Sequence, residues 1–430
     1  MLDRGFRGTS PAAAGGLDQL SSFLFLHYER QLGTAVNSTP LFQALKLAVP
    51  GAFVAVACAG VPCAVLKCSP YIDWIIETPH AMTHTLQAAR TLRSRLRDAP
   101  RAIECVVANS WNRQTRIGLL AVLAGPYARV AGGVIPQVGP GGILEPQAPL
   151  REPYDAGTEY DTEASVVDNN LRILSLLGRE IHHCEPQVFF SPLHLNAAEE
   201  LLSQAHCNDG KPIVLMATEC SGGQPAYWYG DRWAHVADDV AGTLDCHAVF
   251  VGTASEAPAI SAIQRAMRTE SVSLAGKADI PTLAALCCLS DLGITLDTGT
   301  MHVARAVQLP LVIIAPAWQP AHEWLPLGQE RFAILRRNDI ACRHCRKFTC
   351  STRECMDAIS VAEVITAVER LLCDYPPSRE ARRERVAQRL QPPPQNSGLC
   401  QGTVPPCGTV PLAPHLRVAN LGLPDGSRRI

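Results

Sequence analysis

The residues that most suggest chemistry run from Asp297 to His302, in the order Asp-Thr-Gly-Thr-Met-His. They follow the apolar run 289–296 and precede a helix-like run. A strand that turns straight into a helix through Asp-Thr-Gly brings small side chains, a permissive glycine and several unpaired backbone N–H groups to one point. We therefore expect a phosphate cradle made of Asp297, Thr298, Gly299 and Thr300. The same residues also suit an ordinary turn in which Asp297 or Thr298 only caps the helix.

Four cysteines form a second cluster, in the segment Cys342-Arg-His-Cys345-Arg-Lys-Phe-Thr-Cys350-Ser-Thr-Arg-Glu-Cys355. Four thiols on one short loop suit a tetrahedral Zn²⁺ or a single Fe, and the basic residues between them favour thiolates. Such a site would be structural, because four protein ligands leave no open coordination position. Disulfides and free thiols are the alternatives; the other cysteines in apolar runs are expected to be buried, reduced residues.

The cradle belongs to a larger unit of strand, turn, helix and strand, because the apolar run 309–317 follows it. Residues 297–320, with His302 after the turn and a proline-rich loop ending at Pro320, resemble the nucleotide-sugar signature of the heptosyltransferase family, glycosyltransferase family 9. These enzymes move heptose from an ADP carrier in lipopolysaccharide core assembly. Residues 32–46, 124–129 and 169–178 are similar to further segments of the family, so the resemblance covers about residues 23–372.

The periodicity agrees with an α/β fold. Short apolar runs alternate with amphipathic helical stretches from about residue 23 to 132, and again from 212 onward, which is the pattern of parallel sheets covered by helices. The resemblance implies the GT-B type, two Rossmann-like domains facing across a cleft. The expected divisions are a flexible N-terminus at 1–20, an acceptor-side domain at 21–190, a donor nucleotide-sugar domain with the Cys-rich loop at 191–372, and a Pro/Arg-rich disordered tail at 373–430.

The resemblance also assigns donor contacts outside the cradle. The segment 218–233 is similar to the family's phosphate-facing loop, in which Thr218 and Ser221 supply hydroxyls, Ala226 stands where a lysine is usual and Arg232 is a substitute cation. Glu256 follows a strand end and suits the paired hydroxyls of a ribose, or else complements a helix dipole. His302 either touches a phosphate or packs as a buried histidine.

The catalytic base is where the chain departs from the family. Members have an aspartate regarded as the base directly after the glycine of the first loop, whereas here Thr34 follows Gly33. A threonine hydroxyl does not accept a proton near neutral pH. Glu29 is the nearest ionisable substitute and a weak candidate, since a charged residue there also suits a solvated strand end; His80 and His84 are further candidates.

Composition sets the remaining limits. The 430 residues suit two domains, 47% of them are hydrophobic, and the net charge of −2 gives no reason to expect nucleic acid as a partner. Because no signal peptide is recognisable, we expect a cytoplasmic protein, with peripheral association at the inner face of the cytoplasmic membrane left open.

We therefore expect a glycosyltransferase that moves a sugar, heptose by resemblance, from an ADP-sugar to a lipopolysaccharide-core or related glycan acceptor. No cofactor is required for catalysis, because the helix terminus does the work of a cation. The alternative is a catalytically impaired homologue that binds nucleotide-sugars, favoured by Thr34. A nucleotide-dependent epimerase is disfavoured because no Gly-x-Gly-x-x-Gly follows the first strand.

Overall fold

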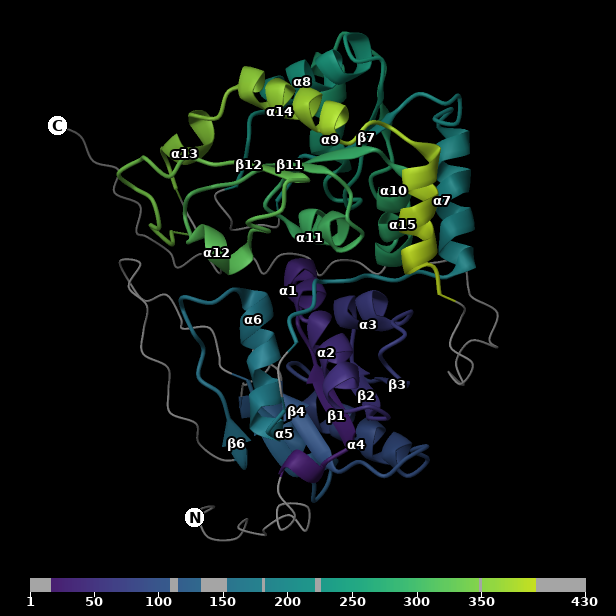
Figure 1. The fold of residues 1–430 in the computed structure, drawn as a ribbon, viewed down its shortest axis with the longest axis vertical. Helices are drawn as coiled ribbons and strands as arrows, with labels where there is room; N and C mark the ends of the chain where they lie inside the picture. The colour runs from purple at the N-terminus through teal and green to yellow at the C-terminus, as the bar shows by residue number, and fades with distance from the viewer. Residues whose placement is uncertain are drawn as a thin grey trace, which may run out of the picture.

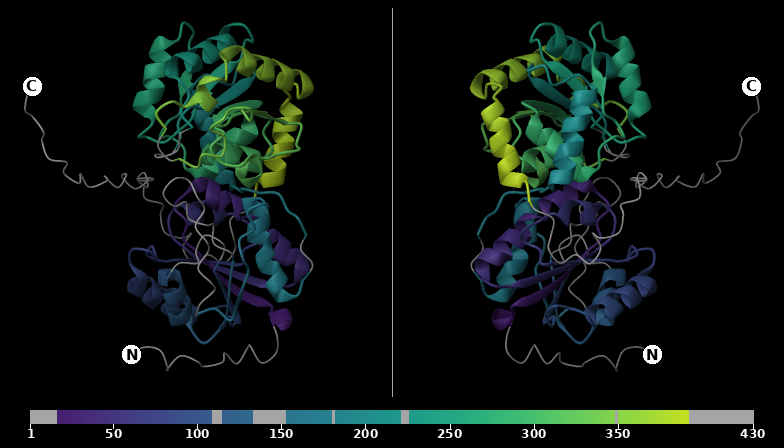
Figure 2. Two further views of the ribbon diagram at one scale, coloured as in Figure 1. Left: turned by 90° about the vertical axis from the view of Figure 1, so that its left-hand side faces the viewer. Right: turned by 90° about the vertical axis from the view of Figure 1, so that its right-hand side faces the viewer.

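The computed structural model describes residues 17–108, 115–132, 153–179, 182–220, 226–347 and 350–391. These residues form two α/β halves stacked along the long axis of the molecule (Figure 1). Both side views show the halves as separate lobes joined at a narrow middle (Figure 2). The α/β, GT-B-type architecture expected from the sequence is confirmed.

The N-terminal half is built on a six-stranded parallel sheet of order β3-β2-β1-β4-β5-β6. Its central strand β1 is buried along its whole length, which agrees with an unbroken apolar sequence between two layers of helices. The strands are β1 (Ser22–His27), β2 (Phe53–Cys58), β3 (Trp74–Glu77), β4 (Cys105–Ala108), β5 (Ala128–Ala131) and β6 (Ala156–Gly157).

The C-terminal half repeats this plan, with a six-stranded parallel sheet of order β12-β11-β10-β7-β8-β9. Its strands are β7 (Ile213–Ala217), β8 (His247–Phe250), β9 (Val272–Ser273), β10 (Leu292–Leu296), β11 (Leu311–Ile314) and β12 (Phe332–Leu335). The predicted unit around the cradle is confirmed, because β10, α11 and β11 follow one another as strand, helix and strand.

Helices cover both faces of each sheet. In the N-terminal half they are α1 (Leu32–Asn37), α2 (Pro40–Ala48), α3 (Val61–Leu66), α4 (Thr85–Leu96), α5 (Thr115–Ala124), α6 (Val166–Leu171) and the 3₁₀ turns Leu17–Gln19 and Arg172–Leu177. In the C-terminal half they are α7 (Pro192–Gln204), α8 (Gly230–Gly242), α9 (Ala257–Ala266), α10 (Ile280–Leu289), α11 (Gly299–Ala306), α12 (Ala321–Trp324), α13 (Glu354–Asp357), α14 (Val361–Asp374) and α15 (Arg379–Arg389). None of the helices in the described ranges is long and apolar enough to cross a membrane.

The two halves share one apolar cluster. It runs without a break from α2, where Phe42 is fully buried, to α10, where Leu286 is fully buried. Because apolar burial contributes about 25 cal/mol per Å², a continuous cluster favours a fixed contact between the halves on this side. The segment that links them, residues 182–191, contains no helix or strand, and Phe190 makes an isolated bridge to Leu390.

The C-terminal tail begins later than residue 373, which corrects the prediction of disorder from that point. Helix α14 continues to Asp374, and α15 packs against α10 beside the C-terminal sheet (Figure 1). The arginines of α15 have specific partners: Arg382 bonds the buried Asp291, Arg385 the Ser290 carbonyl and Arg389 the Ala306 carbonyl. These contacts offset the conformational entropy that α15 loses when it folds. Amino-acid composition does not reveal them, which is why composition predicted disorder. Residues 392–430 and 1–16 lie outside the described residues.

Breaking the contact between α15 and Asp291 should destabilise the fold. The side chain of Asp291 is only 2% exposed, and Arg382→Ala removes its charged partner. Asp291 would still accept a hydrogen bond from the Ile213 amide at 2.8 Å. An uncompensated buried charge costs about 3 kcal/mol, so we expect the free energy of unfolding in urea to fall by that order. Arg383→Ala on the exposed side of α15 is the matched control and should change it by less than about 0.5 kcal/mol. Equal effects of the two changes would contradict this assignment.

Candidate functional site

The cradle lies where β10 meets α11, at the carboxyl edge of the C-terminal sheet. Thr298 occupies the N-cap position of α11, and Gly299 and Thr300 form its first turn. The first N–H groups of a helix have no partner within it, and the helix dipole places partial positive charge there. The structure thus brings together the four residues predicted for an anion site.

Three buried threonine hydroxyls without a hydrogen-bond partner gather near this edge. They belong to Thr218, one residue beyond β7, to Thr295 on β10 and to Thr298. Strands β7 and β10 are neighbours, with Ala217 opposite Thr295. Because a buried hydroxyl without a partner is costly, their gathering indicates a ligand that supplies the missing bonds. Ser221, which the sequence adds to this set, lies outside the described residues.

Asp297 and Arg336 give the cradle its charges. Burial raises the pKa of the Asp297 carboxyl to about 6, and the charge of Arg336 opposes this rise. Burial lowers the pKa of the Arg336 guanidinium, and the charge of Asp297 opposes this decrease. Arg336 lies one residue beyond β12 and donates to Gln319 O and Asn338 Oδ1. Sequence reasoning missed this cation, because Arg336 is 39 residues from Asp297 and only the order of the strands brings β12 to this edge.

The first turn of α11 packs directly on the first turn of α1 from the other half (Figure 1). A Cβ on Gly299 would lie 2.7 Å from Leu32 Cβ, and a Cβ on Gly33 would lie 2.6 Å from His302 Cδ2. Both distances are shorter than a real contact allows, so a side chain at either position would require Leu32 or His302 to shift. The first loop of the N-terminal half and the cradle therefore form one site.

His302 lies inside this contact. Its Nδ1 is 3.2 Å from Asn37 Nδ2, its ring meets that of Trp324 edge-on, and 3% of the residue is exposed. Burial lowers its pKa to about 3, so the imidazole is neutral at physiological pH. Of the two roles considered for His302, contact with a phosphate or packing as a buried histidine, these contacts agree with packing.

Glu256 lies at the N-cap of α9, beyond β8. Its Oε2 accepts from the Thr253 amide at 2.7 Å, and a side chain on Gly252 would collide with it. Glu219 is close enough that burial and the Glu256 charge together raise the Glu219 pKa. One Glu256 oxygen is thus occupied by its own turn, and a neighbouring carboxyl that the sequence did not suggest lies beside it.

The residues considered for proton transfer lie away from the cradle or have other partners. Thr34 is buried and donates to Gln31 at 3.3 Å. Glu29 is also buried, with its Oε2 3.3 Å from Nε2 of His27, whose pKa is lowered by burial. The role of Glu29 as a base stays a prediction. Arg232, the suggested substitute cation, instead donates to the carbonyls of Asp357 and Ile359 at 2.9 and 2.7 Å.

The Cys-rich loop docks on the segment that follows β11. The amides of His344 and Arg346 donate to Ala317 and Trp318, and Arg346 pairs with Glu323 in a buried contact. His344, Arg346 and Arg353 all have positive φ, so the loop is tightly coiled. The Arg353 amide donates to Cys350 Sγ at 3.3 Å and lowers the Cys350 pKa, whereas burial, followed by the other three thiols, raises the pKa of Cys355.

The amide donated to the Cys350 sulfur is suited to a metal-bound thiolate. In the described ranges, however, no group of three or more His, Cys, Asp or Glu residues has the arrangement of a metal site.

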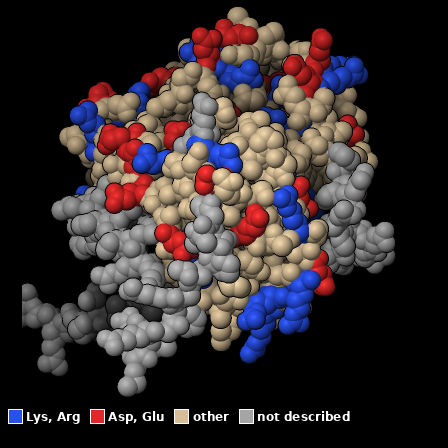
Figure 3. Space-filling view, turned by 60° about the horizontal axis from the view of Figure 1, so that its bottom comes forward, with Lys and Arg blue, Asp and Glu red and all other residues tan. Residues whose placement is uncertain are grey.

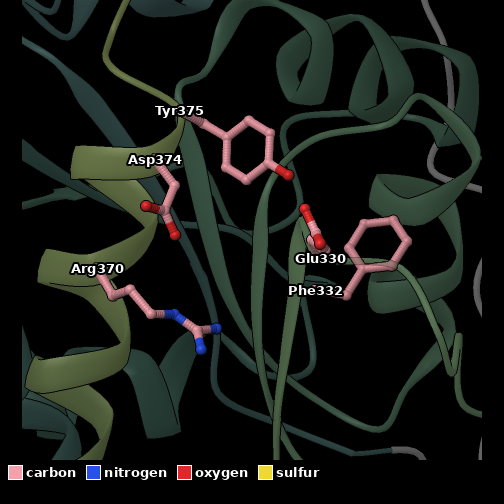
Figure 4. A pocket seen from close by; sticks show the side chains of 5 residues that line it. All are labelled: Glu330, Phe332, Arg370, Asp374 and Tyr375. Atoms are coloured by element: carbon pink, nitrogen blue, oxygen red, sulfur yellow. The ribbon is translucent and has the colours of Figure 1, made fainter.

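A hollow of about 640 Å³ lies elsewhere, at the amino end of β12 (Figure 4). It is lined by Glu330, Phe332, Arg370, Asp374 and Tyr375. Ligands of open α/β sheets bind at the carboxyl ends of the strands, so the cradle and not this hollow is the candidate donor site.

The fold of this chain is shared by solved structures. The chain resembles the glycosyl transferase family 9 protein from Veillonella parvula DSM 2008 at TM-score 0.70 and 20% identity, covering 82% of this chain and 97% of that one. It resembles E. coli ADP-heptose lps heptosyltransferase II at TM-score 0.61 and 17% identity, covering 83% and 99%. For E. coli heptosyltransferase WaaC with ADP-2-deoxy-2-fluoro heptose the TM-score is 0.53 and the identity 11%, covering 81% and 99%. These likenesses confirm the fold.

A family model matches part of the sequence. Residues 162–356, which include the cradle and the Cys-rich loop, match the family model described as glycosyltransferase family 9 (heptosyltransferase). The predicted resemblance is confirmed over these residues, and a glycosyltransferase is the class of enzyme that the match and the fold support. No curated protein matches the chain in sequence.

The raised pKa of Asp297 predicts a pH-dependent affinity for a diphosphate. Because this carboxyl is neutral below about pH 6 and charged above it, repulsion of a bound diphosphate should grow as the pH rises through that value. We expect the affinity for ADP-ribose, whose diphosphate does not titrate in this range, to fall roughly tenfold from pH 5 to pH 8 in calorimetric titrations. Asp297→Asn should abolish the dependence, and the exposed Asp98→Asn should preserve it. A profile unchanged by Asp297→Asn would contradict a position beside the phosphates.

Proposed function

We propose that this chain transfers a sugar, heptose by resemblance, from an ADP-sugar to a hydroxyl of a lipopolysaccharide-core or related glycan acceptor. The observation that carries the proposal is the buried hydroxyl of Thr298, which is at the N-cap of α11 and has no hydrogen-bond partner, together with the partnerless hydroxyls of Thr295 on β10 and Thr218 just beyond β7. E. coli WaaC, whose fold this chain shares, was solved with ADP and with ADP-2-deoxy-2-fluoro heptose. A diphosphate is the anion that we expect here.

In the proposed reaction the acceptor hydroxyl attacks the anomeric carbon while the bond from that carbon to the diphosphate oxygen breaks. The leaving diphosphate gains negative charge, which the N–H groups of Thr298, Gly299 and Thr300 and the positive end of α11 stabilise. Arg336 supplies a full positive charge beside the same turn. The proton of the acceptor passes to a base, for which Glu29 is the candidate from the sequence.

The N-terminal half is proposed to present the acceptor, and the division into domains at 21–190 and 191–372 is part of this proposal. Support comes from the contact between α1 and α11, which places Leu32 and Gly33 against the cradle. A glycan held on the N-terminal half would thus reach the donor carbon from the side of the first loop. A cytoplasmic location, facing the glycolipid on the inner leaflet, fits this acceptor.

A catalytically impaired homologue that binds nucleotide-sugars is the second candidate. It is favoured by Thr34, which is buried and bonded to Gln31, and by the pairing of Glu29 with His27. Both functions use the same donor site, and only sugar transfer separates them.

The deciding experiment measures ADP released from ADP-heptose with and without a lipid A-core acceptor. We expect release that depends on the acceptor. Thr298→Val removes one hydroxyl and keeps the shape of the side chain. Because the variant loses a hydrogen bond to a charged phosphate, we expect ADP to bind about tenfold more weakly or worse. Because this hydroxyl has no partner in the protein, the melting temperature of the free protein should not fall.

The exposed Thr243→Val is the matched control and should leave ADP affinity unchanged. Tight binding of ADP without any release from the sugar would select the binding homologue. Unchanged ADP affinity in Thr298→Val would refute the donor site itself.

We further propose that Cys342, Cys345, Cys350 and Cys355 bind a structural Zn or Fe ion, supported by their place within fourteen residues of one loop and by the amide donated to Cys350. Metal analysis of the purified protein should find about one ion per chain, because four thiolates bind one ion tetrahedrally. Cys345→Ser should lose the ion and lower the melting temperature, whereas Cys373→Ser on α14 should retain it. A wild-type chain without metal after reducing, metal-supplemented purification would exclude this site.

A further inference from the structure

Helix α4 presents a basic stripe to solvent. Its inner face is formed by the buried Ala88, Ala89 and Leu92. At 100° per residue, the side chains of Leu86, Arg90, Arg93 and Arg97 fall within roughly 60° of one another on the other side. All four are exposed, and the helix contains no Asp or Glu.

Helix α5 packs beside α4 and extends the same kind of surface. It exposes Arg116 and Leu119, while Ile117 and Leu120 face the core. We define the α4–α5 face by six residues, Leu86, Arg90, Arg93, Arg97, Arg116 and Leu119. Seen from the side of the N-terminal half, Lys and Arg side chains gather along the lower edge of the molecule (Figure 3).

The charges of this face are unpaired. In the described part of the chain, none of its four arginines has an acidic oxygen within 4.0 Å, whereas arginines elsewhere pair with Asp161, Asp238, Glu185, Glu323 and Asp291. Arg116 donates to the Met82 carbonyl. The excess charge is local, because the chain as a whole carries −2. A concentrated cationic surface on a near-neutral protein indicates an anionic partner.

The apolar members of the face distinguish among anionic partners. Leu86 is 62% exposed and Leu119 45% exposed, both among the arginines. Leucines gain nothing from a hydrated phosphate backbone, but they gain apolar contact at the boundary between lipid headgroups and acyl chains. Cationic side chains beside exposed leucines on one helix pair are the combination that binds an anionic bilayer.

The position of the face fits this partner. Helix α4 begins after β3 and α5 begins after β4, so Leu86 and Arg116 lie at the helix ends nearest the carboxyl edge of the N-terminal sheet. That edge faces the cleft in this fold.

We propose that the α4–α5 face docks the protein on a bilayer rich in anionic phospholipid, with the arginines at the headgroups and the two leucines in the interface. This surface is separate from the donor site, and it agrees with a glycolipid acceptor if the proposed function holds.

Flotation of the full chain with vesicles tests the proposal. We expect binding to vesicles of one-third phosphatidylglycerol in phosphatidylcholine, weak binding to phosphatidylcholine alone, and release by rising salt. The triple change Arg90→Gln, Arg93→Gln and Arg97→Gln should lower the partition coefficient at least tenfold, since each basic residue contributes to attraction at the membrane surface. Leu86→Ser should lower it severalfold and leave the salt dependence intact.

The control removes the same charge from the other half, by Arg265→Gln, Arg370→Gln and Arg383→Gln, and should retain binding. ADP affinity, measured on every variant, should stay unchanged, so failure here is distinguishable from failure of the donor site. Equal binding to neutral and anionic vesicles, or equal loss in the control, would overturn the proposal. Displacement of the chain from vesicles by duplex DNA at equal phosphate concentration would instead assign the face to nucleic acid.

Discussion

The contact between α1 and α11 is the constraint on which the rest of the site depends. Gly33 meets His302 and Gly299 meets Leu32 at distances that leave no room for a Cβ, so two glycines bring the halves together at one point. The hydrogen bond between Asn37 and His302 fixes the same contact with neutral groups. Because interiors are close-packed, a side chain added at either glycine would displace Leu32 or His302 at the contact between the halves. The first turns of α1 and α11 are therefore structurally coupled.

The far end of α11 is held equally firmly. Arg305 pairs with Glu185 in the linker at 2.9 Å, and Arg389 of α15 donates to the Ala306 carbonyl at 3.0 Å. Cations near a helix C-terminus complement its dipole. The helix whose first turn is proposed to meet a diphosphate is thus anchored by the linker on one side and by α15 on the other. The same contacts explain why α15, whose sequence is rich in charged residues, packs against the C-terminal half.

The electrostatics of the cradle are unusual for a site expected to bind an anion. Burial raises the pKa of one carboxyl, Asp297, and the cation that opposes this rise, Arg336, lies one residue beyond β12. The positive character of the cradle comes from backbone N–H groups and this guanidinium.

The sequence by itself determined the fold class and the unit of strand, turn and helix that begins at β10. Alternating apolar runs define parallel strands and their helices through local periodicity, and Asp-Thr-Gly before a helix is a local signal as well. It did not determine that Arg336 lies close enough to Asp297 to influence its pKa, that His302 packs against Gly33, or that Arg382 pairs with Asp291 and so helps to order α15. Those contacts join residues far apart in the chain, and their geometry follows from strand order and from the approach of the two halves. A local pattern carries no information about which distant side chains meet, so only the tertiary structure decided them.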